Sequence, residues 1–378
     1  MMLSGFFRWI GQCRRKLLHV HKRYRKNHAV PLSVPPLVLQ ADPVPVYPFA
    51  MTTDTNDIER FVAAPFIKEI GRGVKGARSM TREDARALYA AMLEGRVSDL
   101  ELGAILLAMR IKGESVDELG GFMDAAAASF SPLPTPRGEF APVLIPTYNG
   151  ARKLANLTPL LALLLAREGV PTLVHGVRTD PGRVTTAEIL GALGLTEATT
   201  AAEVQNEFVH LRPAFMPIEH LAPRLAQMLS LRRVLGVRNS THTLVKILQP
   251  FDGPALRLVS YTHPEYLETL GGFFEGVDSE TQGDAFLMRG TEGETVAHPH
   301  RAQRIDWFHA GQRALLVERD APTDDLSEVP DGRDAATTAA WIGAALRGEV
   351  PVPASIATQV AYCVEVSRKI RARSQPLA

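Results

Sequence analysis

The chain has 378 residues and an ordinary globular composition, with 46% hydrophobic and 22% charged residues and a formal net charge of +1. This length allows two domains with a large core. No apolar run is long enough for a membrane span. Because Cys13 and Cys363 provide neither metal-ligand spacing nor a disulfide framework, we expect a cytoplasmic protein with no metal site and no cofactor.

The small net charge conceals an uneven distribution. Residues 1–50 hold eight of the 42 basic residues but only Asp42 of the 41 acidic ones. The rest of the chain is therefore acidic as a whole. A nucleic-acid site on that part must be a local basic patch.

Residues 1–50 differ in composition from everything that follows. A basic stretch leads into a proline-rich one, and the apolar run near the start is too short, and too broken by Arg8, for a secretory signal. Two interpretations are open: a flexible basic arm that binds nucleic acid, or a translation start placed upstream of the true one. Met51, just ahead of the folded region, favours the second. Either way we expect residues 1–50 to be poorly ordered.

Residues 51–130 are predicted to form a small helical domain. Three Ser or Thr residues are followed three positions later by an acid, which is the capping-box spacing of a helix start: Thr81 with Asp84, Ser98 with Glu101, and Ser115 with Glu118. Apolar residues recur at helical spacing behind each start. Gly95 and Gly113 are placed to end two of the helices.

The segment 71–78 ahead of those helices is glycine-rich and basic. It fits the pattern G-x-G-x-x-G, but no strand precedes it and the residues before it look like the end of a helix, so a dinucleotide site is a weak interpretation. Its glycines would let the backbone approach a phosphate chain. Arg72, Lys75 and Arg78 are therefore candidate phosphate contacts, with a solvated loop that binds nothing as the alternative.

A proline-rich linker over residues 131–138 leads into a second domain over residues 139–378, where strands and helices alternate. This alternation predicts a mostly parallel sheet covered by helices on both faces. We expect strands at 141–145, 172–174, 207–211, 255–261 and 285–288, a late strand pair at 304–308 and 314–318, and helices at 158–167, 185–193, 219–235, 264–275, 335–346 and 355–370.

The join between the first strand and its helix is the centre of the predicted site. It contains Asn149, Gly150, Arg152, Lys153 and Asn156, followed by an almost continuously apolar helix. Open α/β sheets bind ligands where strands end and helices begin, and N–H groups at such positions favour anions. We therefore expect phosphate near this loop.

Several motifs in order resemble a known family. Residues 58 to about 370 resemble anthranilate phosphoribosyltransferase, and the stretches Tyr148–Lys153, Ala155–Pro159 and Gly169–Gly176 resemble its DNA-binding YbiB-type paralogues. The resemblance implies a small helical domain that forms a homodimer contact, followed by an α/β domain of phosphoribosyltransferase type. It also implies that Arg238 stands where active relatives keep an arginine that meets the acceptor's carboxylate.

The same resemblance puts transferase activity in doubt. Active relatives hold pyrophosphate with a Gly-Thr-Gly-Gly-Asp loop, whereas residues 146–150 here are Pro-Thr-Tyr-Asn-Gly. The relatives' Lys-His-Gly-Asn motif corresponds to Val174–Val177, and their adjacent Asp-Glu pair for Mg²⁺ corresponds to Gly290–Glu294, where the acids are separated. Proline removes an N–H donor, and Mg²⁺ needs well-placed carboxylates.

We predict a sequence-nonspecific nucleic-acid-binding protein that uses a basic groove derived from the old substrate cleft, with DNA as partner and RNA also open. Residues 224–246 contain six basic residues and no acid, which favours phosphate contact. His175 is expected to be a buried, hydrogen-bonded histidine rather than a catalytic one, and Tyr148 is the one candidate for base stacking.

The alternatives are a transferase with an unidentified acceptor and a pure assembly protein. The full set of candidate phosphate contacts is Arg72, Lys75, Arg78, Asn149, Arg152, Lys153, His175, Arg178, Arg183, Arg212, Arg224, Arg232, Arg233, Arg238 and Lys246.

Overall fold

A computed structural model describes residues 59–73, 75–319 and 329–374. The expectations for residues 1–50 lie outside the described residues. Within the described part, no helix is long and apolar enough to cross a membrane.

The first described elements are helices, as predicted. They are α2 (Ala64–Ile70), α3 (Arg82–Leu93), α4 (Asp99–Lys112) and α5 (Val116–Ala127). The Thr81, Ser98 and Ser115 side chains each accept the N–H three residues ahead, and the last two are complete capping boxes. These side chains satisfy N–H groups that a helix start leaves unpaired, which confirms the three predicted starts.

Helices α3 and α5 form the core of this domain. Tyr89 and Phe122 pack with ring centroids 4.9 Å apart. The close approach depends on Gly121, where a Cβ would lie 2.2 Å from the carbonyl oxygen of Arg82. The two backbones can therefore come closer than any larger residue would permit.

The second domain is built on a seven-stranded sheet in the order β3-β2-β1-β4-β5-β6-β7. All pairs from β3 to β5 are parallel, while β5–β6 and β6–β7 are antiparallel. The strands are β1 (Val143–Thr147), β2 (Thr172–Gly176), β3 (Ala214–Pro217), β4 (Ala255–Ser260), β5 (Gly283–Met288), β6 (Ile305–His309) and β7 (Gln312–Val317). The mostly parallel sheet confirms the predicted fold class.

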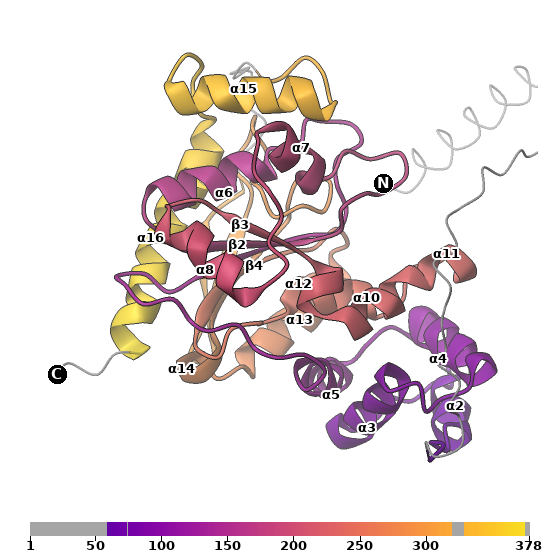
Figure 1. Ribbon diagram of the computed structural model, residues 1–378. Helices are drawn as coiled ribbons and strands as arrows, with labels where there is room; N and C mark the ends of the chain where they lie inside the picture. The colour runs from indigo at the N-terminus through magenta and orange to yellow at the C-terminus, as the bar shows by residue number, and fades with distance from the viewer. Residues whose placement is uncertain (1–58, 74, 320–328, 375–378) are drawn as a thin grey trace, which may run out of the picture. The chain divides into compact units, whose positions relative to one another are not determined.

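Helices cover both faces of the sheet (Figure 1). Strand residues alternate between two apolar clusters, with Val143 and Ile145 in one and Leu144 in the other. The remaining helices are α6 (Thr158–Arg167), α7 (Thr186–Ala192), α8 (Ala201–Val209), α9 (Ile218–Leu221), α10 (Pro223–Ser230), α11 (Arg232–Leu235), α12 (Thr241–Ile247), α13 (Glu265–Glu275), α14 (Ser279–Gln282), α15 (Ala335–Arg347) and α16 (Ala354–Ser374). Helices α6, α15 and α16 pack in the first cluster, and α10, α12 and α13 in the second.

Two predicted elements were wrong. The expected strand at 207–211 lies mostly in helix α8, and the third strand is β3, closer to the C-terminus. The expected long helix at 219–235 is three short helices, because Ala222 before Pro223 adopts φ −147° and ψ 79°. Helix α12, which carries Lys246, was not predicted.

The long helix α16 is joined to the segment that enters β1. The backbone N–H of Ala141 donates to the carbonyl of Ser367, and the Ser367 hydroxyl donates to the carbonyl of Ala141 at 2.6 Å. Arg371 adds hydrogen bonds to the carbonyl of Phe140. Cys363 of the same helix is fully buried, and burial raises the pKa of its thiol.

Candidate functional site

The loop after β1 turns sharply and leads to α6. Gly150 has φ +63°, and a Cβ there would lie 2.8 Å from the carbonyl oxygen of Val184. Ala151 pairs with Val184 through two backbone hydrogen bonds of 2.9 Å. The β1–α6 loop and the β2–α7 loop are thereby held together, and this is the neighbourhood where we expected phosphate.

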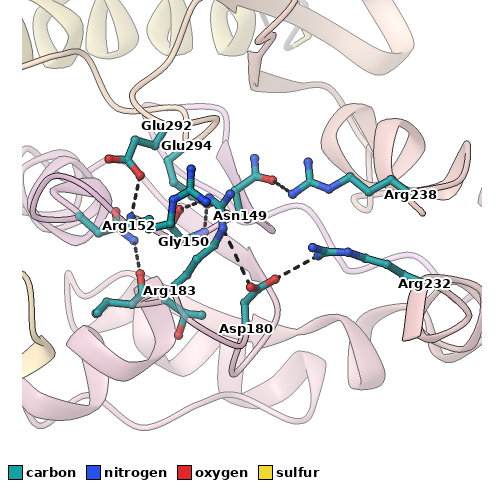
Figure 2. A network of polar contacts seen from close by, with 12 residues as sticks. Asn149, Gly150, Arg152, Asp180, Arg183, Arg232, Arg238, Glu292 and Glu294 are labelled. Atoms are coloured by element: carbon teal, nitrogen blue, oxygen red, sulfur yellow. Dashed lines mark hydrogen bonds and ion pairs between the residues drawn. The ribbon is translucent and has the colours of Figure 1, made fainter. Parts of the chain in front are cut away.

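The N–H groups of the β1–α6 loop are occupied by two glutamates of the same chain. Oε1 of Glu294 accepts the N–H groups of Asn149 and Gly150 at 2.8 and 2.7 Å. The carboxylate of Glu292 accepts three more, from Arg152 at 2.6 Å, Lys153 at 2.7 Å and Leu154 at 2.9 Å (Figure 2). The loop does bind an anion, but that anion is a glutamate side chain from about 140 residues further along the same chain.

The two glutamates differ in burial. Glu294 is 1% exposed, and burial raises the pKa of its carboxyl against the opposing effect of the N–H groups. Glu292 is only half-buried and adopts φ +53°, a conformation that residues with a Cβ rarely take. Glu294 is thus part of the packed interior, while Glu292 reaches the loop from the surface, out of the tight turn that it forms with Gly293.

Basic side chains converge beside this loop (Figure 2). A guanidinium nitrogen of Arg238 donates to Oδ1 of Asn149 at 2.6 Å, and Arg183 donates to the carbonyl of Gly150 at 3.2 Å. Burial lowers the pKa of Arg238 most, and the positive charges of Arg232 and Arg183 lower it further. Lys246 donates to the carbonyl of Gly293 at 3.3 Å, and burial lowers the pKa of its amine to about 8.

One acid lies among these cations. Residues 224–246 contain no acid in the sequence, but Asp180 from the β2–α7 loop forms a 3.2 Å ion pair with Arg232 and lies 4.0 Å from Arg183. The run of cations is thus free of acids along the sequence but not in the folded protein, where the cations still outnumber Asp180.

The other predicted cations fall into two groups. Arg72, Arg178 and Arg212 form ion pairs with Glu69, Glu197 and Glu207 respectively, and Arg78 lies 3.9 Å from Glu69. Five of the predicted cations are exposed and have no acidic partner within the described part of the chain: Lys75, Arg152, Lys153, Arg224 and Arg233. The second group is the one available to an external phosphate.

His175 and Tyr148 do not face a ligand. His175 is 1% exposed, and its Nδ1 lies 2.8 Å from the Tyr148 hydroxyl. Burial lowers the pKa of His175 to about 3, so the ring is neutral. This confirms the expectation of a buried, hydrogen-bonded histidine, but His175 cannot then be a phosphate contact in this conformation. Tyr148 is 6% exposed, which also excludes it as a stacking platform.

A cleft of about 130 Å³ lies beside the cluster, between the helical domain and α12. Arg238, His242 and Lys246 line one side, and Arg110 and Glu114 of the helical domain line the other. Burial and, to a smaller extent, the positive charge of Arg238 lower the pKa of His242 to about 3. Sequence reasoning missed Arg110, because nothing in the local pattern of α4 distinguishes it from a solvated helix residue.

The segment 71–78 is separate from this cluster in its interactions. Arg72 is paired with Glu69 of its own domain, and Gly73 has φ +82°. No hydrogen bond or ion pair between described residues links this segment to the β1–α6 loop. No such bond between described residues therefore joins Lys75 or Arg78 to Arg152.

The residues present do not fit the magnesium site of active transferases. Among the described residues, no three carboxylate, imidazole or thiol groups converge as ligands. Glu292 and Glu294 direct their carboxylates at backbone N–H groups instead. The two glutamates, which are not adjacent in the sequence, therefore bind two neighbouring parts of the β1–α6 loop.

Comparison with known proteins identifies the family. A family model described as the helical bundle domain of the glycosyl transferase family matches residues 64–130. A protein of Escherichia coli K12 named "Uncharacterized protein YbiB" is 45% identical over 314 residues, which cover 82% of this chain and 96% of that protein. The chain belongs to the YbiB family.

The YbiB family fold resembles that of anthranilate phosphoribosyltransferases. The enzyme of Rhizobium meliloti is 28% identical over 229 residues, covering 60% of this chain and 64% of that enzyme. The structure of the Thermus thermophilus enzyme matches with a TM-score of 0.60 at 22% identity, covering 82% of this chain and 92% of that one. The Saccharomyces cerevisiae enzyme in complex with PRPP and Mg matches with a TM-score of 0.63 at 13% identity, also over 82% and 92%. These similarities confirm the fold that the motifs implied.

Proposed function

We propose that this member of the YbiB family binds nucleic acid without sequence preference, through the basic surface around the β1–α6 loop and the neighbouring cleft. The observation that carries the proposal is the crowding of cations around Arg238. Burial lowers the pKa of Arg238 most. The positive charges of Arg232, Arg183 and Arg110, from three separate segments, lower it further, and Asp180 opposes them. Like charges held this close cost free energy unless a polyanion compensates them.

The surrounding surface fits a phosphate backbone better than a base-specific reader. Arg152, Lys153, Arg224 and Arg233 are exposed cations without acidic partners among the described residues. Tyr148, the one aromatic side chain predicted to stack on bases, is buried. Affinity would therefore be mostly electrostatic and would fall steeply with salt. DNA is the first candidate partner and RNA the second.

The alternative function is a phosphoribosyltransferase-like activity on an unidentified acceptor. The fold shared with anthranilate phosphoribosyltransferases favours it. The buried Glu294 argues against it, because it occupies the N–H groups of Asn149 and Gly150 that a pyrophosphate would need. Calorimetric titration with phosphoribosyl pyrophosphate and Mg²⁺ distinguishes the two, since only the transferase hypothesis requires tight binding.

We also propose that two copies pair through the helical domain. Helix α4 exposes Leu100, Ala104, Leu107 and Ile111, which recur at helical spacing on one face. Leu100 is 85% exposed, and Ile111 is 59% exposed. A contiguous apolar stripe of this kind favours association, and a second copy of the same chain is the occupant that the family resemblance implies.

The nucleic-acid proposal is tested by binding to duplex and single-stranded DNA over a salt series. Arg233→Gln removes one unpaired cation, and Arg347→Gln removes an exposed arginine of α15 that pairs with Glu349. We expect wild-type protein to bind with a steep salt slope, and Arg233→Gln to lower that slope by about one unit on all sequences. Arg347→Gln should match wild type. Absence of binding at low salt would overturn the proposal and favour a pure assembly protein.

A further inference from the structure

The contact between Glu292 and the β1–α6 loop has the form of a bound anion. One carboxylate accepts the consecutive N–H groups of Arg152, Lys153 and Leu154, at 2.6, 2.7 and 2.9 Å. Consecutive amides that point to one spot form an anion-binding concavity. The side chains of Arg152 and Lys153 are exposed, and neither forms an ion pair within the described residues.

A third cation lies beside the three amides. Arg333, which is exposed, donates to the carbonyl of Arg152. The three amides are thus surrounded by Arg152, Lys153 and Arg333, while the anion they hold carries a single negative charge. A phosphate group has more acceptor oxygens than a carboxylate and could contact amides and basic side chains together.

The backbone of Glu292 indicates that its carboxylate can be displaced. Its φ of +53° belongs to a tight turn that the N–H of Glu294 closes by donating to the carbonyl of Thr291 at 2.9 Å, so the backbone there is held without the help of the carboxylate. Glu292 is half-buried, whereas Glu294 on the adjacent amides is 1% exposed. The Glu292 carboxylate can therefore leave the amides while the turn, and the packed interior around Glu294, stay as they are.

We propose that the amides of Arg152, Lys153 and Leu154 form a phosphate-binding site, that Glu292 occupies it in the free protein, and that an incoming phosphate enters by displacing Glu292. The proposal rests on the proposed function, in which that phosphate belongs to a nucleic-acid backbone. A free pyrophosphate would present the same chemistry. Glu292 then determines selectivity, because small anions must compete with it singly, whereas a polyanion gains contacts with the other cations at the same time.

The test replaces Glu292 and follows the three amides directly. Glu292→Gln keeps the shape of the side chain and removes its charge. Glu168→Gln is the matched control, since Glu168 is exposed at the end of α6 and makes no side-chain hydrogen bond or ion pair within the described residues. The probes are inorganic pyrophosphate and a short duplex DNA. The measurements are the amide NMR signals of residues 152–154 and the two dissociation constants.

We expect Glu292→Gln to tighten pyrophosphate binding by about tenfold relative to wild type, with shifts at all three amides, because a charged competitor for them is gone. Duplex DNA should also bind more tightly to it than to Glu168→Gln. Glu292→Gly, which suits the positive φ and removes the acceptor altogether, should give the same result. This second variant keeps the test decisive if the first disturbs the loop.

The two proposals fail in different ways. If wild-type protein binds DNA but both Glu292 variants match Glu168→Gln for each probe, the displacement is wrong and the nucleic-acid function stands. If no protein binds DNA but both Glu292 variants gain pyrophosphate binding at residues 152–154, the nucleic-acid function is wrong and the displacement stands.

Discussion

Lys246 is the cation of the candidate site whose charge changes near neutral pH. Its amine is partly buried beside Gly293, and burial lowers its pKa to about 8, opposed by Glu294 and reinforced by Arg238 and Arg183. The protonated amine is the form that attracts phosphate. Its contribution to binding is therefore present below about pH 8 and lost as the pH rises through that value.

We expect the affinity for DNA to fall between pH 7 and pH 9 in wild-type protein. Lys246→Arg should bind with little change over the same range, because an arginine stays charged. Fluorescence anisotropy at constant ionic strength measures both. An equal fall in the two proteins would show that another group is responsible.

At the scale of residues, the sequence predicted which basic residues lie near the β1–α6 loop, but not which acidic residues contact them. It identified Arg152, Lys153 and Arg238 near an anion-binding loop, and it expected His175 to be buried. It could not place Glu292 on the loop, since that contact joins residues 140 positions apart in a segment without regular structure. Nor could it place Asp180 among cations that are distant from it in the sequence.

At the scale of elements, the capping box at the start of α5 does more than begin a helix. Glu118 is fully buried and accepts the N–H of Met80 at 3.0 Å, the N–H of Ser115 at 2.8 Å, and the amine of Lys112 at 2.6 Å. One carboxylate thus joins the entry to α3, the end of α4 and the start of α5. Glu101 occupies the same position in the box of α4, but among the described residues its carboxylate accepts hydrogen bonds from Ser98 alone.

This difference predicts unequal effects of the same substitution. Glu118→Ala should lower the free energy of unfolding by about 3–5 kcal/mol, because it leaves two N–H groups without their acceptor and the buried ammonium of Lys112 without its counter-charge. Glu101→Ala should cost about 1 kcal/mol, as expected for one capping interaction. Urea denaturation followed by circular dichroism measures both. Similar losses would mean that the buried contacts of Glu118 add nothing to its capping role.

Most elements followed from local patterns, and the errors have identifiable causes. The run at 207–211 was predicted as a strand, yet Thr200 and Glu203 form a capping box that the same sequence rule would have found. The break before Pro223 was also visible, since a residue preceding proline avoids the helical conformation. Strand β3 was hidden because it has only four residues and ends in a proline.

At the scale of the whole molecule, the exposed face of α4 predicts the assembly state. Leu107→Glu would place a charge in the middle of the proposed contact between copies. We expect it to weaken the dimer by about 30-fold or more, as for a central interface residue. Sedimentation equilibrium measures the change.

Val209→Glu is the matched control for this measurement. Val209 is also a strongly exposed aliphatic residue, 79% exposed on α8 of the other domain. It should leave the association constant unchanged. A monomeric wild-type protein, or equal effects of the two substitutions, would contradict pairing through α4.

The hydrogen bonds between α16 and the entry to β1 have a consequence for biosynthesis. Ser367 bonds to Ala141 across 226 residues, and β1 also lies between β2 and β4. The helical domain, in contrast, makes most of its contacts within a short stretch of chain, and such local contacts form early. On the ribosome, we expect the helical domain to fold while translation continues. The second domain should complete its folding only after α16 has emerged.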